Sequence, residues 1–250
     1  GRREKSEQPG STVGIVCVLF IAGCSADVLG VKRYVPQASE VESVTVSVNG
    51  VSTTLKSEDN IEAVAQKHEE ILGFEDLSNI GYGDTIGITY KLKSGKVVER
   101  SYTLYLYDGD ATFAVPDNVD RIKAANKVYT GLCKICDGDE GVMNRLSLLL
   151  DEDAWPINIG LSYGDEQDGS LSFSSKKQMH DFVQNAVMKD VEEHGLGMAY
   201  GDTTGHYVGN LYAGTQVGDS YNSVDIDLFE DNCPNVAKWI KSNLGVDILK

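Results

Sequence analysis

The chain has 250 residues, 41% of them hydrophobic, with 22 basic and 38 acidic side chains and a formal net charge of −16. This length and composition are typical of a globular protein that forms one or two compact units around a real core. So negative a chain repels phosphate backbones and anionic surfaces, which argues against nucleic acid as a partner.

An apolar segment, residues 12–31, follows a basic flank, residues 1–11, and carries a single charge at Asp27. Its uninterrupted apolar part is shorter than the roughly 20 residues that a helical membrane span usually needs. It is also longer than most strands and shows no alternation of polar and apolar residues, so a buried strand is the least favoured interpretation.

Two interpretations of residues 12–31 remain open. In the first, the segment is a lipoprotein signal: the flank supplies basic residues, Ile21-Ala22-Gly23-Cys24 looks like a bacterial lipobox, and Cys24 would be lipidated after cleavage. In the second, it is a transmembrane helix whose basic flank stays in the cytoplasm. Both place the rest of the chain outside the cytoplasm, at the cell membrane.

The residues after the apolar segment, DVLGVKRYVPQASEVESVTVSVNG, contain an Asp-apolar-apolar-Gly element, a Tyr-Val-Pro and a Val-x-Ser-Val strand. This stretch resembles the junction between the last membrane helix and the C-terminal domain in a family of ABC-type exporter permeases from gram-positive bacteria. The matching residues are Asp27, Gly30, Tyr34, Val35, Pro36, Val41, Ser43 and Val44. Further similar segments are a helix with a histidine inside it (61–72), a hairpin (88–104) and a terminal helix (235–247).

This resemblance implies an extracytoplasmic, non-catalytic domain of poorly known role, attached to a transport permease. Its implied partners are the membrane, the membrane helices of the transporter and a separate ATPase subunit. The chain begins at Gly1 without a methionine and without the earlier membrane helices of that family, so we expect it to be a fragment of a longer permease. Its acidic surface would attract cationic substrates such as antimicrobial peptides. The alternative function is a free-standing lipoprotein, anchored at Cys24, that acts as a binding or interaction module.

The first half, residues 38–136, predicts two hairpins and two helices. SVTVSV and VSTTL flank Asn49-Gly50, the strongest short hairpin signal. Ser57 caps a helix with apolar residues at helical spacing. TIGITYKL and VVERSYTLYL, joined by KSGK, form the second hairpin, and a helix then runs from Pro116 to about Cys136.

The second half, residues 157–250, repeats this order. INIGLSY and SLSF predict a strand pair, and Ser175 with Gln178 forms a capping box before a helix that Gly195 ends. HYVGNLYA and SYNSVDIDL predict another pair, and Pro234 begins the last helix.

Residues 137–156 connect the halves and contain a short helix, MNRLSLLL. We therefore expect an α+β fold with antiparallel sheets covered by helices on one face, a possible internal duplication of a ββα-ββα unit, and one N-terminal apolar helix.

The cysteines of Cys133-x-x-Cys136 lie at the C-terminal end of a predicted helix, whereas a redox pair normally lies at a helix N-terminus. We expect them to be buried structural thiols. Cys233 precedes Pro234, and a metal site made with the other two cysteines would need a fourth ligand that the sequence does not indicate.

The histidines share no metal-ligand spacing; they are His68, His180, His194 and His206. His68 lies on the apolar face of its helix, which favours a hydrogen-bonded histidine in the core or at its boundary. His194 lies near a helix C-terminus, where it complements the helix dipole.

Two acidic clusters, each near glycine, leave weak divalent binding open: Asp165, Glu166 and Asp168, and Asp137, Asp139 and Glu140. Neither follows the EF-hand ligand order, so solvated turn residues are the favoured interpretation.

No nucleophile-elbow, P-loop or dinucleotide motif lies between a strand and a helix. A third function class is a secreted hydrolase or metal enzyme, but the sequence shows no set of nucleophile, base and oxyanion donors for it. We therefore predict no catalytic, cofactor-binding or metal-binding residues. The ATPase of a transporter would be another chain.

Overall fold

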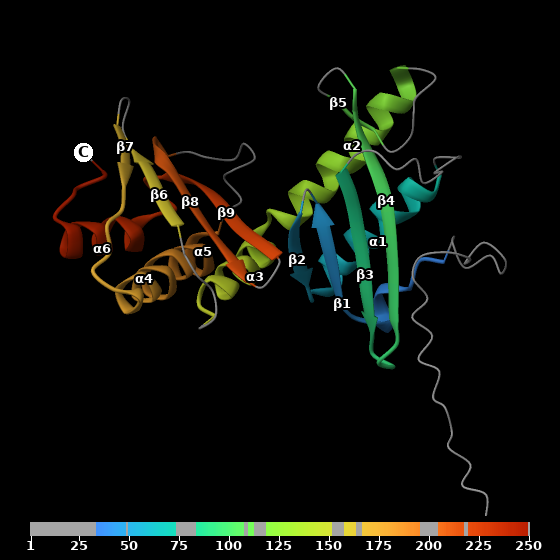
Figure 1. Cartoon of the computed structure of the whole chain (residues 1–250), viewed down its shortest axis with the longest axis horizontal. Helices are drawn as coiled ribbons and strands as arrows, with labels where there is room; N and C mark the ends of the chain where they lie inside the picture. The colour runs from blue at the N-terminus through green and yellow to red at the C-terminus, as the bar shows by residue number, and fades with distance from the viewer. Residues whose placement is uncertain are drawn as a thin grey trace, which may run out of the picture. The chain divides into compact units, whose positions relative to one another are not determined.

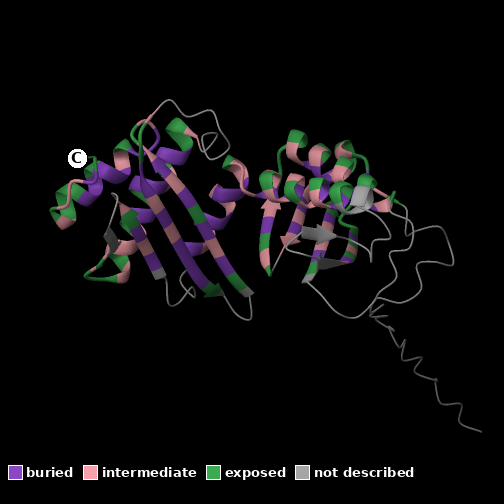
Figure 2. Cartoon of the chain, turned by 90° about the horizontal axis from the view of Figure 1, so that it is seen from above, coloured by how far each residue is buried: buried purple, intermediate pink, exposed green. Residues whose placement is uncertain are grey.

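The computed structural model describes residues 34–48, 50–73, 84–107, 110–112, 119–151, 158–163, 167–195, 205–217 and 220–249. Within them the fold is α+β, with two antiparallel sheets that each carry helices on one face, as predicted (Figures 1 and 2). The basic flank 1–11, the apolar segment 12–31 and Cys24 lie outside the described residues.

The first sheet has the strand order β2-β1-β3-β4-β5, and every neighbouring pair is antiparallel. Its strands are β1 (Val41–Val48), β2 (Val51–Leu55), β3 (Asp84–Leu92), β4 (Val97–Tyr107) and β5 (Asp110–Thr112). The hairpins turn at Gly50 (φ 80°) and Gly95 (φ 83°), where a side chain would strain the backbone. A 3₁₀ turn, Ala38–Glu40, precedes β1.

Two helices, α1 (Glu58–Leu72) and α2 (Val119–Cys136), complete the first half. The predicted cap is confirmed, because the Ser57 side chain accepts a hydrogen bond from the backbone N–H of Asn60. Apolar residues of α1 at helical spacing, such as Ile61 and Val64, are buried against alternate residues of the strands, such as Val44 and Ile88.

The second sheet has the strand order β7-β6-β8-β9, again antiparallel throughout. Its strands are β6 (Asn158–Tyr163), β7 (Gln167–Ser170), β8 (Tyr207–Val217) and β9 (Ser220–Phe229). Its helices are α4 (Lys176–Phe182), α5 (Met188–His194) and α6 (Pro234–Leu244), and a π-helical turn (Val183–Val187) joins α4 to α5.

An aromatic group fills the middle of the second core. The ring centroid of Phe182 lies 4.9 Å from that of Trp239 and 5.6 Å from that of Phe173. Around it lie buried aliphatic residues of β8 and β9, among them Leu211 and Ile226. The predicted helix ends are confirmed, since Pro234 begins α6 and Gly245, with φ 74°, ends it.

Omitting β5, the two sheets arrange corresponding strands alike: in each, the second strand of the half pairs with the first, the first with the third, and the third with the fourth. In each half a helical segment connects the second strand to the third. The common order agrees with the predicted repeat of elements, and an internal duplication remains a prediction.

Three details differ from the sequence-based expectation. Strand β5 was not predicted. The second strand of the second half was placed at SLSF, but β7 spans Gln167–Ser170, because Leu171 and Phe173 pack against the core instead of continuing the strand. The connecting helix, α3 (Asp139–Leu149), begins earlier than the stretch MNRLSLLL.

Helix α3 is hydrogen-bonded to both sheets at Arg145, through its buried side chain and its backbone carbonyl. Nη1 of Arg145 donates to Thr53 Oγ1 in β2 at 2.7 Å and to the carbonyl of Cys136 at 2.9 Å. The carbonyl of Arg145 accepts from Asn222 Nδ2 in β9 at 2.9 Å. Gly141 makes this packing possible, since a Cβ there would clash with the carbonyl of Cys136.

Candidate functional site

The second sheet exposes a face rich in tyrosine and aspartate. Along β8 and β9, buried residues such as Leu211 and Ile226 alternate with side chains that point to the opposite side, away from the helices. The strand register brings these outward residues together as cross-strand pairs. We call the following set the tyrosine–aspartate face: Tyr207, Asn210, Tyr212, Gly214, Tyr221, Asp225, Asp227, Phe229 and, on the neighbouring strand β6, Gly160.

Aromatic rings give this face most of its apolar surface. Tyr207 and Tyr221 remain 59% and 48% exposed, which is unusual for side chains of this size in a folded domain. The ring of Tyr207 meets the edge of Phe229, with 5.6 Å between the centroids. Exposed rings held in place by their neighbours form a surface suited to contact with a partner.

Two tyrosines cover a glycine on β8. The hydroxyl groups of Tyr212 and Tyr221 are hydrogen-bonded to each other. A Cβ added to Gly214 would lie 2.5 Å from the hydroxyl oxygen of Tyr221 and 3.0 Å from that of Tyr212. Glycine at this position therefore leaves room for both hydroxyl groups above the strand. On β6, a Cβ at Gly160 would meet no atom within 4 Å, so the surface beside Tyr212 is open.

Two carboxylates lie beside these rings. Asp225 and Asp227 are two residues apart on β9 and share the outward side of the strand. Nδ2 of Asn210 donates to the Oδ1 atoms of both, at 3.1 Å for Asp227, which fixes the two carboxylates next to each other. Burial, and after it the charges of Asp227 and Asp225, raises the pKa of Tyr207. The face thus combines negative charge with exposed aromatic rings.

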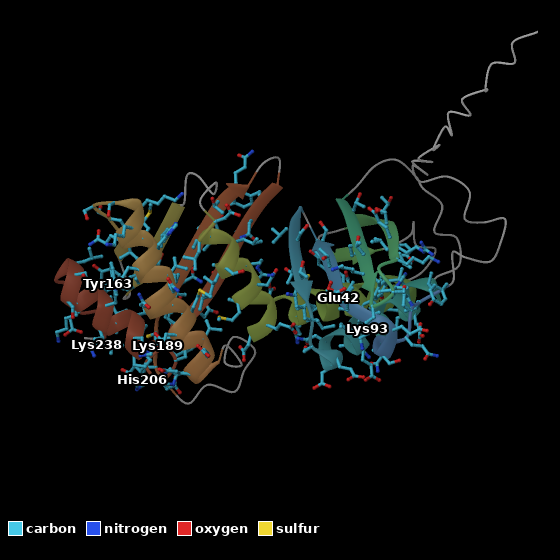
Figure 3. All side chains as sticks on the ribbon, turned by 90° about the horizontal axis from the view of Figure 1, so that it is seen from below. Glu42, Lys93, Tyr163, Lys189, His206 and Lys238 are labelled. Carbon is cyan, nitrogen blue, oxygen red and sulfur yellow. The ribbon has the colours of Figure 1, made fainter. Side chains whose placement is uncertain are left out.

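The corresponding face of the first sheet has a different composition. Cross-strand pairs there join hydroxyl residues, such as Thr45 and Thr54, whose Oγ1 atoms lie 2.9 Å apart. Its charges form ion pairs: Nζ of Lys91 donates to Glu42 Oε1 at 2.7 Å (Figure 3 labels Glu42). Among its described side chains, this face thus shows hydroxyl groups and ion pairs at these positions, where the second sheet has aromatic rings beside carboxylates.

His68 belongs to the core of the first half, as the sequence predicted. Its Nδ1 lies 3.0 Å from the hydroxyl of Tyr90 and its Nε2 lies 2.5 Å from the hydroxyl of Tyr102. Since a neutral imidazole has one donor and one acceptor, one hydroxyl donates to the ring and the other accepts from it. Burial, followed by the charge of Arg100, lowers the pKa of His68 to about 4. Burial likewise raises the pKa of Tyr102 to about 12.

The other histidines lie on separate elements. His180 lies on α4, and His206 is exposed directly before β8 (Figure 3). His194 lies in the last turn of α5, as predicted, with Nε2 3.9 Å from Asp190 Oδ1.

The structure also separates the cysteines. Cys136 is buried in the first core and Cys233 in the second, and burial raises the pKa of each thiol to about 12. Burial likewise raises the pKa of the half-buried Cys133. The expectation of buried structural thiols is confirmed for Cys136, while Cys133 lies at the boundary of the first core.

The interpretation of the acidic residues at 137–140 as solvated turn residues was wrong for Glu140, which lies in α3, whereas Asp137 is a turn residue with a half-exposed side chain. Asp137 forms an ion pair with Arg145, at 2.8 Å between Oδ1 and Nη2. Glu140 accepts hydrogen bonds from the backbone N–H of Ser57 at 2.9 Å and from Asn60 Nδ2 at 2.7 Å, so it caps helix α1 from another helix. A carboxylate from a distant segment satisfies the helix end here, which local spacing in the sequence does not reveal.

Asp190 does the same in the second half. It is buried on α5 and accepts from the backbone N–H groups of Asn235 and Val236 at 2.9 and 2.8 Å, at the start of α6. Because this acid supplies the cap, Cys233 occupies the N-cap position without a side-chain hydrogen bond.

Metal binding by Asp165, Glu166 and Asp168 stays a prediction, because the first two lie outside the described residues and the side chain of Asp168 is not described. Across the described ranges, no three histidine, cysteine or acidic side chains gather as metal ligands would.

A small apolar pocket of about 220 Å³ opens beside α6. Leu161 and Tyr163 of β6, the latter labelled in Figure 3, line it together with Ile240, Leu244 and Ser172. Its volume is below the roughly 300–1,000 Å³ typical of small-molecule sites. The tyrosine–aspartate face is therefore the stronger candidate for a functional surface.

Comparison with known proteins gives no match to a family model, to a curated protein or to a solved structure. In the part of the chain that the structure describes, no helix is both long enough and apolar enough to cross a membrane.

Proposed function

We propose that the chain is the extracytoplasmic, non-catalytic domain of an ABC-type exporter permease, and that it contacts the exported substrate or the outer face of the transporter. Residues 12–31 would be its retained membrane span at the cell membrane. Its partners would be the membrane helices of the transporter, a separate ATPase subunit and a cationic exported substrate. The location and the transporter rest on the sequence resemblance around residues 27–50.

The observation that supports a binding role is the tyrosine–aspartate face. A sheet face that leaves two large rings about half exposed, next to two adjacent carboxylates, has the composition of a contact surface. The buried groups support the non-catalytic part of the proposal. His68 is enclosed by two tyrosines, and the pKa values of the thiols are raised, so these groups serve the core and are poorly suited as base or nucleophile.

A topology experiment tests the location. The chain, expressed with its natural upstream sequence in intact gram-positive cells, should be cleaved by added protease, while a cytoplasmic marker stays intact. After solubilisation in detergent it should co-purify with an ABC-type ATPase. Protection of the domain in intact cells, or purification without any ATPase, would contradict the proposal.

The lipobox-like residues 21–24 support a second candidate, a free-standing lipoprotein anchored at Cys24. Metabolic labelling of intact cells with a fatty acid distinguishes the two. Label on the wild-type chain that is lost in Cys24→Ser would favour the lipoprotein, whereas an unlabelled chain that stays in the membrane would favour the permease.

A further inference from the structure

We propose that the tyrosine–aspartate face binds an extended basic peptide segment, with its lysine or arginine side chains at Asp225 and Asp227 and over the neighbouring tyrosine rings. This inference rests on the binding role proposed above and names the surface and the partner. It does not depend on attachment to a transporter.

The shape of the face suits an extended chain. Gly214 and Gly160 occupy outward positions on adjacent strands, and the tyrosine rings lie across Gly214. Gly214 is buried beneath the two tyrosines, but no Cβ rises from Gly160, so a strand-like peptide can approach the sheet closely at β6. Space beside Tyr212 remains open above Gly160, where a Cβ would meet nothing within 4 Å.

The spacing of the acids suits the same ligand. Residues i and i+2 of a strand point to one side and lie roughly 7 Å apart, which holds for Asp225 and Asp227 and equally for alternate residues of an extended peptide. Asn210 occupies only the Oδ1 atom of each carboxylate. Two basic side chains separated by one residue can thus reach both acids at once.

The aromatic rings add attraction for cations and area for their aliphatic stems. A lysine or arginine placed over a tyrosine ring gains a cation–π contact, and its methylene groups pack on the ring. Tyr212 is the cross-strand partner of Asp225. Tyr207 lies near both acids: burial is the largest cause that raises the pKa of Tyr207, and the charges of Asp227 and Asp225 are the next. Rings and carboxylates therefore act on the same few ångströms of a bound peptide.

The sign of the charge selects this partner over a neutral one. Exposed tyrosines on a flat sheet would also stack against a sugar, but the face carries two adjacent carboxylates within a chain of net charge −16. Long-range attraction therefore raises the encounter rate with a basic peptide and not with a neutral oligosaccharide.

Titration of the 250-residue chain with an acetylated and amidated (Thr-Lys)₄ peptide tests the proposal, with binding followed by calorimetry at about 20 and 150 mM salt. We expect D225N/D227N to weaken binding about tenfold at low salt. Tyr221→Ala should weaken it about threefold. A (Thr-Gln)₄ peptide should not bind.

The matched control removes the same charge elsewhere. E62Q/E99Q neutralises two exposed carboxylates of the first half and should leave the affinity within twofold of the wild type. All variants change exposed or half-exposed side chains, so thermal unfolding should confirm that each is folded.

Three outcomes would overturn the proposal: no binding of (Thr-Lys)₄ at low salt, equal weakening by D225N/D227N and by E62Q/E99Q, or binding of a neutral oligosaccharide that Tyr221→Ala abolishes while the peptide fails to bind. The protease and co-purification experiments measure location and assembly. A negative result in those experiments would leave the peptide titration unaffected, and a negative titration would leave the proposed location and assembly unaffected.

Discussion

Omitting β5, the two sheets have the same order of strands, but three tyrosines of β8 and β9 point to the opposite side from Tyr90 and Tyr102 of the first sheet. In the first sheet Tyr90 and Tyr102 point inward and enclose His68. In the second, Tyr207, Tyr212 and Tyr221 point outward, because the inward side is filled by Phe182, Trp239 and aliphatic residues. The comparison shows that strands in the same order can differ in which of their residues face the helices. That difference decides whether an aromatic residue stabilises the core or forms a surface.

The largest expected effect is on the aromatic group in the second core. Phe182 is fully buried between Trp239 and Phe173, so Phe182→Ala should lower the free energy of unfolding by about 4 kcal/mol. Urea denaturation measures it. Phe173→Ala, at a half-buried position, serves as the control and should cost clearly less. A loss below about 1 kcal/mol for Phe182→Ala would show that this core is loosely packed.

The first core should differ from the second in its response to pH. His68 has a pKa of about 4 when folded and 6.5 as its ordinary value, so the unfolded chain binds the proton first as the pH falls. The stability that depends on neutral His68 is complete above pH 6.5 and is lost progressively down to about pH 4. At about 1.4 kcal/mol for each pKa unit, the loss is about 3 kcal/mol.

Denaturation series from pH 7.5 to pH 4 measure this loss. His68→Gln should lower stability at neutral pH and flatten the dependence, because glutamine does not titrate. Phe182→Ala should instead lower stability by a similar amount at each pH. An unchanged profile in His68→Gln would show that another group causes the acid sensitivity.

Removal of a tyrosine hydroxyl should reduce stability more in the core of the first sheet than on the exposed face of the second. Tyr102→Phe leaves the buried His68 Nε2 without its partner, so we expect a loss of about 1–2 kcal/mol. Tyr221→Phe, on the exposed face, should change stability by less than about 0.5 kcal/mol. Equal losses in thermal or urea unfolding would contradict the distinction between a core pair and a surface pair.

The smallest expected effect concerns the cap that α3 gives to the first half. Glu140→Ala removes the carboxylate that accepts from Ser57 and Asn60 at the start of α1 and should cost about 1 kcal/mol. Burial raises the pKa of Glu140, but the hydrogen bonds from Ser57, Asn60 and Lys56 outweigh it, so the pKa is lowered from 4.5.

The contribution of Glu140 is therefore complete above pH 4.5 and is lost only below it, after most of the His68 effect. Stability curves of Glu140→Ala should run parallel to those of the wild type between pH 7.5 and pH 5. Convergence of the curves within that range would contradict the assignment. Glu62→Ala, an exposed position on α1 outside the cap, is the matched control and should cost less than about 0.5 kcal/mol.

Part of the candidate face could be read from the sequence, because Asp225 and Asp227 alternate with buried Val224, Ile226 and Leu228. That alternation predicts a polar side but does not say which strands lie next to it. The cross-strand partners Tyr212 and Gly160 come from strands about 50 residues apart in the chain, and only the paired sheet brings them together.

The sequence by itself determined the order of helices and strands apart from β5, the caps at Ser57 and Pro234 and the burial of His68, because these depend on periodicity and on groups within a few residues. The tertiary structure alone decided the strand order and the contacts of Glu140 with Asn60 and of Arg145 with Thr53, which span 80 and 92 residues. It also decided which tyrosines form a surface. Such contacts depend on which faces are left to be buried once the local elements have formed, and spacing along the chain does not encode that choice.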